Sequence, residues 1–112
     1  MERMRSGRAN RNDSPRFYKI ILAHLSEELR IPPNFVKHVT EEVAAIALLK
    51  GPCGKNWSLK LREDENGTFF HGASWKKFQK KQYFEGAEFL VFHYDGRMTF
   101  HVQIFDKNGM ER

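Results

Sequence analysis

The residues best placed to do chemistry are the lysines of one short segment, WKKFQKKQ. Trp75 and Phe78 are three positions apart, so on a helix they share one face, which we expect to be buried. The lysines then fall elsewhere around the helix, toward solvent; they are Lys76, Lys77, Lys80 and Lys81. Exposed ammonium groups at this density suit the phosphates of a nucleic acid. From charge alone, a solvated helix face explains them equally well.

Three other groups of residues could support catalysis or metal binding, but their context argues against each. Cys53 lies in a glycine-rich loop, and nothing near it in sequence would activate its thiol. His93 and His101 fall on neighbouring predicted strands, where the expected register places them on opposite faces. The acidic run at 63–65 could hold a divalent ion for nuclease chemistry, although a solvated turn is the simpler interpretation. We therefore expect no enzyme, no metal or other cofactor, and no small-molecule substrate.

The positive charge of the chain is concentrated in two places. Among 112 residues there are 19 basic and 14 acidic side chains, a net charge of +5. Residues 1–16 hold five arginines against two acidic residues, and residues 75–88 hold four lysines against two glutamates. These two segments account for the whole excess, which indicates a basic patch rather than a diffusely basic surface.

The composition is that of one small folded domain. Hydrophobic residues make up 40% of the chain and Phe occurs 10 times, which is ample for a packed core. The single cysteine excludes an intramolecular disulfide and fits a reducing compartment. No apolar run approaches the length of a membrane span, and the arginine-rich start lacks the apolar stretch of a signal peptide. No membrane partner is therefore expected.

The lysine-bearing helix must be positioned by the segment before it, which has the pattern of a β-hairpin. Apolar residues at 57, 59 and 61 alternate with polar ones, the two-residue period of a half-buried strand. Asn66 and Gly67 supply the positive-φ pair that a tight turn favours. A return strand begins at 68, ends at Gly72 and leads into the helix.

Most of the remaining chain is predicted to be strand. Residues 17–22 have the pattern of a strand buried on both faces apart from Lys19, and residues 29–31 form a short extended piece. Pro33 favours a short helix over 33–39 that buries Phe35, Val36 and Val39. Residues 42–50 fit a helix by propensity, but their length and the Gly-Pro pair that follows favour a strand.

A second hairpin is predicted near the end of the chain. Its strands, 88–94 and 98–105, are joined by the Asp-Gly pair at 95–96. With Tyr94 opposite Arg97, Val91 is expected to pair with Phe100. We divide the chain into a disordered basic arm (1–16), a domain (17–106) and a C-terminal tail (107–112). Strands of this length with two short helices predict an all-β barrel or sandwich.

An ordered set of short motifs over residues 17–105 resembles the plant-specific B3 DNA-binding domain. It is most similar to the reproductive-meristem branch of that family, which includes the vernalisation factors. The motifs are FYK at 17–19, LRIP at 29–32 with Phe35, WSLKL at 57–61, WKKF at 75–78, Gly86, and FHVQIF at 100–105. No single motif is specific, whereas their order and spacing are. The resemblance implies a seven-stranded open β-barrel with two short helices that binds duplex DNA in the major groove.

The resemblance also implies two arms that grip the DNA. The first is the loop after the first strand, residues 23–27, with Lys19 nearby. The second is the hairpin with its exit into the helix, residues 62–77. Three positions depart from the family pattern: the first loop reads HLSEE, Ser74 replaces a usual glycine, and Ala87 replaces a usual aspartate of structural role.

The expected contacts divide into phosphate and base contacts. Phosphates are expected to meet Arg62, Lys76, Lys77, Lys80 and the arginines of the basic arm. Base edges are expected to meet His24, Ser26, Asn66 and Thr68. Only Arg62 and Asn66 in the arms can form bidentate pairs with bases. We therefore expect an affinity for DNA that is largely electrostatic and a modest preference for particular base sequences.

The first hypothesis is therefore a DNA-binding module of a plant transcriptional regulator, which would act in the nucleus with duplex DNA and other regulators as partners. Two further hypotheses stay open beside it. One is a protein-interaction domain that kept the barrel and lost DNA affinity. It draws support from acidic residues in or near both arms: Glu27, Glu28, Glu63, Asp64 and Glu65. The other is a nuclease that uses the acidic hairpin tip.

Overall fold

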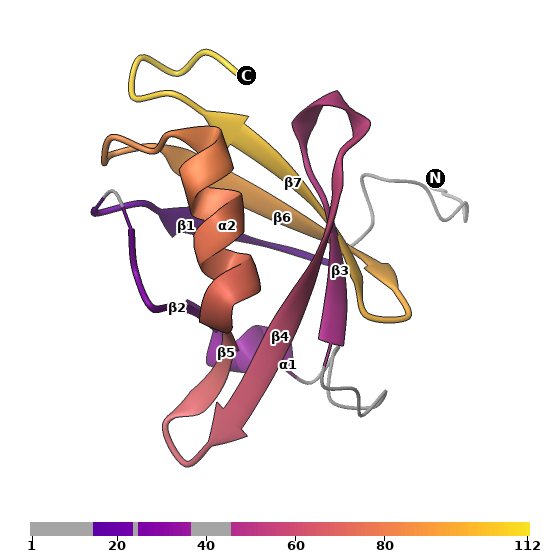
Figure 1. Cartoon of the computed structure of the whole chain (residues 1–112). Coiled ribbons are helices and arrows are strands. Elements are labelled where there is room, and N and C mark those ends of the chain that lie inside the picture. Colours follow the sequence, from indigo (N-terminus) through magenta and orange to yellow (C-terminus); the bar gives the residue numbers. More distant parts are fainter. Residues whose placement is uncertain (1–14, 24, 37–45) are drawn as a thin grey trace, which may run out of the picture.

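The computed structural model describes residues 15–23, 25–36 and 46–112, and these residues form a single curled sheet with helices beside it (Figure 1). The strands are β1 (Arg16–Ile20), β2 (Glu28–Ile31), β3 (Ile46–Lys50), β4 (Asn56–Asp64), β5 (Gly67–His71), β6 (Phe89–Gly96) and β7 (Thr99–Phe105). The helices are α1 (Pro33–Val36), a short 3-10 turn η3 (Pro52–Gly54) and α2 (Gly72–Gln82). The predictions for residues 1–14, for His24 and for 37–45, Val39 included, lie outside the described residues.

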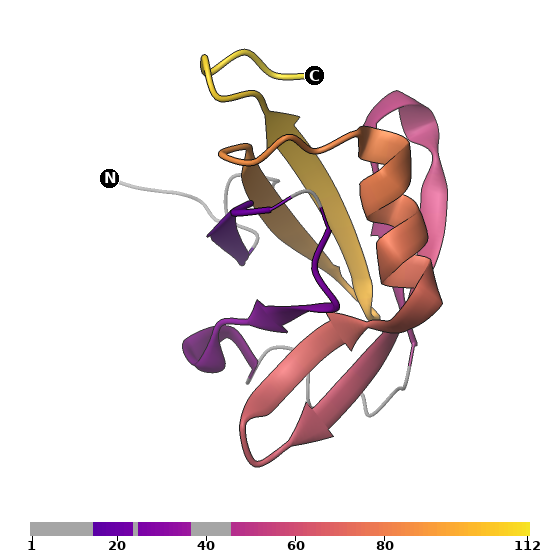
Figure 2. The ribbon, with the colours of Figure 1, turned by 60° about the vertical axis from the view of Figure 1, so that its left-hand side comes forward.

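The sheet is a seven-stranded open barrel, which confirms the predicted fold class. The strand order is β1-β6-β7-β3-β4-β5-β2, with β3 and β7 parallel and the other pairs antiparallel. β1 and β2 are consecutive in the chain but lie at the two ends of this order. The connection between them therefore crosses the open side of the barrel, where β2 runs along the β4–β5 hairpin (Figure 2).

The core is well packed, and half of its side chains are aromatic. Phe17 stacks on Phe92 with ring centroids 4.7 Å apart, and Phe70 meets Phe100 edge to face at 5.4 Å. Such pairs add about 0.5–1.5 kcal/mol each beyond the area they bury. α2 lies against β4 and β5 and closes one side of this core (Figure 1).

The buried face of α2 confirms the prediction from its spacing. Trp75 and Phe78 are fully buried, and their rings stack at 5.6 Å. Trp57 meets Phe78 edge to face, also at 5.6 Å, but it is only half-buried because it lies at the margin of the helix. The lysines of α2 are left on its outer surface, with Lys76 half-buried and the other three exposed.

The first strand departs from the sequence prediction, because only one of its faces is buried. Phe17 and Ile21 point into the core, but Tyr18 and Ile20 are 57% and 58% exposed. β1 is an edge strand, and nothing in the described part of the chain covers its outer face. The Tyr18 ring stacks instead on Phe89 of β6, at 5.4 Å.

The predicted register of the second hairpin is also wrong. Tyr94 pairs with Phe100 and not with Arg97, and Val91 pairs with Gln103. The turn is made by Arg97 and Met98, whose φ angles are 53° and 56°, and a bulge at residue 95 takes up the shift. An Asp-Gly pair is the commoner turn signal, but here the next two residues adopt the left-handed conformation that the turn requires.

The corrected register brings His93 directly opposite His101, with ring centroids 6.1 Å apart, and not onto the other face. His93 Nε2 lies 2.6 Å from Gln103 Oε1. Over the described ranges, no group of three or more His, Cys, Asp or Glu side chains is arranged to hold a metal ion. In the same ranges, no helix has the length and apolar character needed to cross a membrane.

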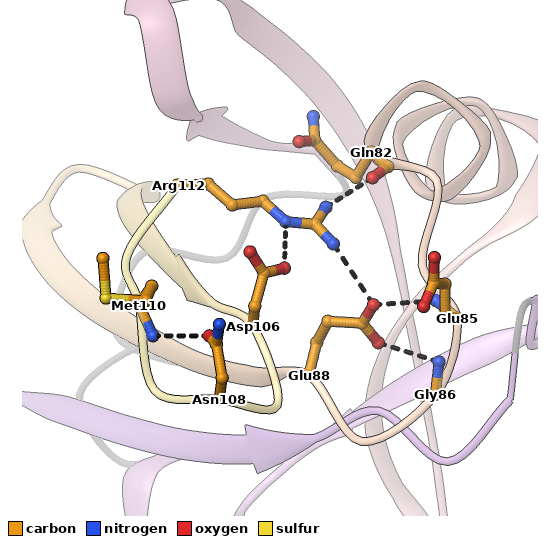
Figure 3. A network of polar contacts seen from close by, with 8 residues as sticks. All are labelled: Gln82, Glu85, Gly86, Glu88, Asp106, Asn108, Met110 and Arg112. Carbon is orange, nitrogen blue, oxygen red and sulfur yellow. Dashed lines mark hydrogen bonds and ion pairs between the residues drawn. The ribbon is translucent and has the colours of Figure 1, made fainter.

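The last residues, which the sequence indicated as a tail, fold back onto β7. The Arg112 backbone N–H donates to the Ile104 carbonyl at 2.8 Å. The Arg112 guanidinium donates to the Gln82 carbonyl at the end of α2, to Asp106 at 2.7 Å and to Glu88 at 3.2 Å (Figure 3). The C-terminal residues therefore connect β7 to the end of α2.

Glu88 is the buried centre of this network. Its carboxylate accepts the backbone N–H groups of Glu85 and Gly86 at 2.7 and 2.8 Å (Figure 3). Burial by itself would raise the pKa of Glu88, but these backbone hydrogen bonds and the charge of Arg112 outweigh it, so the pKa is lowered. Glu88 holds the loop next to Ala87, where the family pattern has its aspartate.

Candidate nucleic-acid interface

The first arm, residues 23–27, of which the structure describes all but residue 24, is anchored to α2 by Gln79. The Gln79 amide accepts the Ser26 backbone N–H at 2.8 Å and donates to the Ser26 carbonyl at 2.9 Å. The indole N–H of Trp75 donates to the Ser26 hydroxyl at 3.3 Å. Gln79 is only 1% exposed, whereas Ser26 is exposed, so these hydrogen bonds tie an exposed loop to a buried amide. Ser26 thereby fixes the arm against the helix, with its hydroxyl already hydrogen-bonded to the protein.

Gln79 is a residue that sequence reasoning missed. It lies four positions after Trp75, on the same helical face as the buried aromatic residues. A polar side chain on an apolar face was the available signal, because a buried amide requires hydrogen-bond partners. The partner, 53 positions away, could not be found from local pattern.

The second arm, predicted over residues 62–77, begins with the tip of the β4–β5 hairpin, where its arginine is paired with carboxylates. The Arg62 guanidinium donates to Glu28 of β2 and to Asp64, and it lies 4.3 Å from the centre of the Phe69 ring. The hydrogen bond with Glu28 is the main cause that raises the pKa of Arg62. Arg62 is thus oriented, and much of its charge is compensated within the protein.

The turn of this hairpin also differs from the prediction. Glu65 and Asn66 form its tip, and only Gly67, at φ 135°, has a positive φ. The Asn66 backbone N–H donates to the Asp64 carboxylate at 2.7 Å, which leaves the exposed Asn66 amide at the tip. Thr68, also predicted to meet bases, is 6% exposed and offers almost no surface.

Between the arms lie two cations, Lys19 and Arg30, and the second was not singled out from the sequence. Leu29 and Ile31 point inward, so Arg30 is on the outer face of β2. There it follows Phe69 and Arg62 in one row across three strands. The in–out alternation of 29–31 was the signal for it.

Arg30 packs closely over the start of β5. Gly67 has the positive φ that favours glycine, and a Cβ there would lie 2.8 Å from Arg30 Nε, so the Arg30 side chain would have to shift to make room. Burial and then the positive charge of Arg30 lower the pKa of Lys19. Neither cation forms an ion pair with another residue that the structure describes. Two like charges are thus held near one another between the arms.

The lysines of α2 divide between two flanks of the helix. Lys76 points to the first arm and pairs with Glu27 at 3.0 Å. Lys77, Lys80 and Lys81 instead line a hollow together with Lys55 from the β3–β4 connection. The lysines of α2 that were predicted to contact phosphate therefore do not form one continuous surface.

Comparison with known families and proteins identifies the fold and its relatives. Residues 17–108 match the family model described as the B3 DNA binding domain. The chain is 36% identical over 108 residues to the B3 domain-containing protein Os01g0723500 of Oryza sativa subsp. japonica, covering 88% of this chain and 27% of that protein. It is 34% identical over 96 residues to the B3 domain-containing protein REM20 of Arabidopsis thaliana, covering 85% and 33%. The chain thus spans between a quarter and a third of the length of these two relatives.

Solved structures share the architecture. The structure of the hypothetical Arabidopsis thaliana protein At1g16640.1 is similar with a TM-score of 0.72 and 23% identity, over 90% of this chain and 99% of that one. The N-terminal domain of Helicobacter pylori LlaJI.R1 is similar with a TM-score of 0.55 and 10% identity, over 80% of each chain. At these identities the likeness concerns the fold alone. The family match and the relatives above 30% identity carry the assignment, and the chain belongs to the B3 DNA-binding domain family.

Proposed function

We propose that the domain binds double-stranded DNA in the major groove with its two arms, as the DNA-binding module of a plant transcriptional regulator in the nucleus. Membership of the B3 family supports DNA binding. The second arm is a two-stranded ribbon, an element that the major groove of B-DNA is wide enough to admit. Membership of the reproductive-meristem branch is part of the same proposal.

The observation that carries this proposal is the placement of Lys19 and Arg30. They lie between the two arms, where burial and, to a lesser extent, the charge of Arg30 lower the pKa of Lys19, and neither is paired with a carboxylate among the described residues. Phosphate oxygens from a duplex would relieve this repulsion. Each phosphate neutralised by a cation releases condensed counterions, so such contacts supply affinity that falls with salt.

Specificity is proposed to be modest, because the arms offer few free groups that read bases. Arg62 is already engaged by Glu28 and Asp64. Asn66 keeps a side-chain amide at the tip, where it can form a bidentate pair with adenine. The base contact predicted for His24 stays a prediction. Ser26 is proposed to act indirectly, by holding the first arm on α2.

The test is a fluorescence-anisotropy titration of duplex DNA at several salt concentrations. Lys19→Gln combined with Arg30→Gln should weaken binding to all sequences alike and reduce the salt slope by about two units. Arg97→Gln with Lys107→Gln removes the same charge at exposed positions away from the arms and should leave the slope nearly unchanged. Equal slopes for both double variants would refute the proposed interface.

The second candidate is a protein-interaction domain, and the carboxylates of the arms favour it. Glu27, Glu28 and Asp64 compensate cations that would otherwise face phosphate. The same titration decides between the two functions. Absence of duplex binding at low salt, where electrostatic affinity is greatest, would favour a protein partner.

A further inference from the structure

A hollow of about 450 Å³ at the C-terminal half of α2 is lined by four lysines and two aromatic residues. We call it the lysine pocket, and its residues are Lys55, Trp57, Lys77, Lys80, Lys81 and Tyr83. Pockets for small ligands usually measure about 300–1,000 Å³. The residues come from the β3–β4 connection, the start of β4 and the end of α2, which lie toward the same end of the molecule in Figures 1 and 2.

The lysine pocket lies away from the second arm. Trp57 is near the start of β4, and Asp64 is at its other end. Seven residues of extended chain separate them by roughly 23 Å. Figure 1 shows the β3–β4 connection and the tip of the β4–β5 hairpin at opposite ends of this strand. A ligand held in the pocket is therefore well separated from the second arm, whereas Lys80 and Tyr83 also line a neighbouring hollow with Leu25 of the first arm.

The positive charges of the lysine pocket are not neutralised by carboxylates inside it. No carboxylate lines it, and none of its four lysines has an ion pair among the residues that the structure describes. Four ammonium groups around one hollow repel one another, and one multivalent anion would offset this repulsion. The ammonium group of lysine is a compact point charge with three donors, suited to phosphate oxygens.

We propose that the lysine pocket binds a compact polyphosphate, a ligand with several closely spaced phosphate groups, at a site separate from the duplex. The phosphates would meet the four lysines. The aromatic residues would give the organic part of such a ligand a flat surface: Tyr83 is 81% exposed, and Lys55 Nζ lies 6.0 Å from the centre of the half-buried Trp57 ring.

A simpler role, the favourable interaction of cations with a helix C-terminus, explains only part of the arrangement. Lys80 and Lys81 lie in the last turn of α2, where positive charge stabilises the helix. Lys77 is a turn earlier, and Lys55 comes from another element. Lys55 is positioned by its own loop, in which its carbonyl accepts the Gly51 N–H at 2.8 Å. Stabilisation of the helix C-terminus by positive charge does not explain why lysines from two separate elements meet at one hollow.

The test uses inorganic tripolyphosphate as the probe and calorimetry as the readout. We expect one probe to bind per chain. Lys55→Gln with Lys81→Gln should weaken binding roughly fivefold or more, since each exposed ion pair contributes modestly. The control, Arg97→Gln with Lys107→Gln, removes the same charge outside the pocket and should change affinity by less than about twofold. Equal losses in the two double variants, or no binding of the probe by the wild-type chain, would overturn the proposal.

Tryptophan fluorescence gives a second, local readout. The chain has two tryptophans; Trp75 is fully buried, whereas Trp57 lines the pocket. Tripolyphosphate should change the emission of the wild-type chain, and Trp57→Phe should abolish the change while calorimetric binding persists. A change that persists in Trp57→Phe would place the probe elsewhere and contradict the site.

A competition experiment distinguishes free polyphosphate from the phosphates of a duplex. With the arms saturated by a short duplex, tripolyphosphate should still bind with similar affinity. Its displacement by the duplex would show that the pocket lysines belong to the DNA interface, as the sequence predicted for Lys77 and Lys80, and would overturn the claim of a separate site.

Discussion

At the two arms, Arg62 and Lys76 each contact carboxylates, whereas the four cations of the lysine pocket contact none among the described residues. The presence or absence of carboxylate partners distinguishes two roles of positively charged side chains in this domain. A paired cation is held in one orientation and adds little net charge, which suits positioning on a particular surface. An unpaired cluster attracts multivalent anions with little regard to orientation. Between the arms lie two cations with no carboxylate partner among the described residues, Lys19 and Arg30, and duplex affinity is proposed to depend on them.

The first arm and the lysine pocket both lie against α2, on two of its flanks. Gln79 holds the first arm on one flank, and Trp57 packs against Phe78 beside the pocket on the other. Because one helix supports both, a variant that damages its core should affect both regions. A variant on one flank should affect one region alone.

The largest effect is expected from Phe78→Ala. Phe78 is fully buried and packs against Trp57, Trp75 and Phe84. Truncation of a buried phenylalanine costs about 3–5 kcal/mol, so the free energy of unfolding should fall by that amount in urea denaturation followed by circular dichroism. Phe78→Leu should cost clearly less. A loss below about 1 kcal/mol for the alanine variant would show that the two flanks do not depend on this packing.

Glu88→Gln should destabilise the chain by about 2 kcal/mol at neutral pH, because it removes the charge that accepts two backbone N–H groups and faces Arg112. The folded-state pKa of Glu88 is lowered, so its stabilisation is complete above the ordinary value of 4.5. It is lost as the pH falls through the lower folded-state pKa.

The check is urea denaturation of both chains across the acidic range. The difference between wild type and Glu88→Gln should shrink below pH 4.5 and duplex binding at neutral pH should stay the same. A difference that grows as the pH falls would contradict the sign of the pKa shift.

Gln79→Ala should separate the two regions by loosening only the first arm. Loss of the amide removes both hydrogen bonds to the Ser26 backbone, at a cost of about 1 kcal/mol in stability, because water can reach the exposed Ser26. Duplex binding should weaken severalfold, while tripolyphosphate binding stays the same. Gln82→Ala, on the same helix, is the control, because the Gln82 side chain makes no hydrogen bond within the described ranges and its carbonyl, which accepts from Arg112, is kept. An equal loss of affinity for duplex DNA and for tripolyphosphate would mean that Gln79 supports the whole helix.

The smallest effect is expected from Glu28→Gln, which releases Arg62 from one carboxylate. Duplex binding at low salt should become about two- to threefold tighter, and the gain should fade as salt rises. Tripolyphosphate binding should not respond. Glu111→Gln removes the same charge near the C-terminus, outside both arms, and serves as the control. Weaker duplex binding by Glu28→Gln would indicate that Glu28 is needed to orient Arg62.

Local pattern predicted the elements that depend on neighbours in sequence. The alternation at 57–61 and the three-residue spacing of Trp75 and Phe78 are such cases, and both are confirmed. The register of β6 and β7 was not predictable in this way. It depends on a bulge at 95 and on the Tyr94 hydroxyl, which accepts the Met98 N–H at 3.2 Å. Neither is encoded in the Asp-Gly signal.

The candidate site was predictable in its location and less so in its contacts. The resemblance to the B3 domain placed the arms. It could not show that Glu28 compensates Arg62, since these residues are 34 positions apart. The meeting of Lys55 with the lysines of α2 is likewise tertiary, because it brings one loop to the end of a helix.

The most direct test of the separation between the two regions is the salt dependence of duplex binding in three chains: wild type, Lys19→Gln with Arg30→Gln, and Lys55→Gln with Lys81→Gln. The slope should fall by about two units in the arm variant and stay at the wild-type value in the pocket variant. The opposite pattern, with the slope lost from the pocket variant and kept in the arm variant, would show that duplex DNA binds at the lysine pocket and not between the arms.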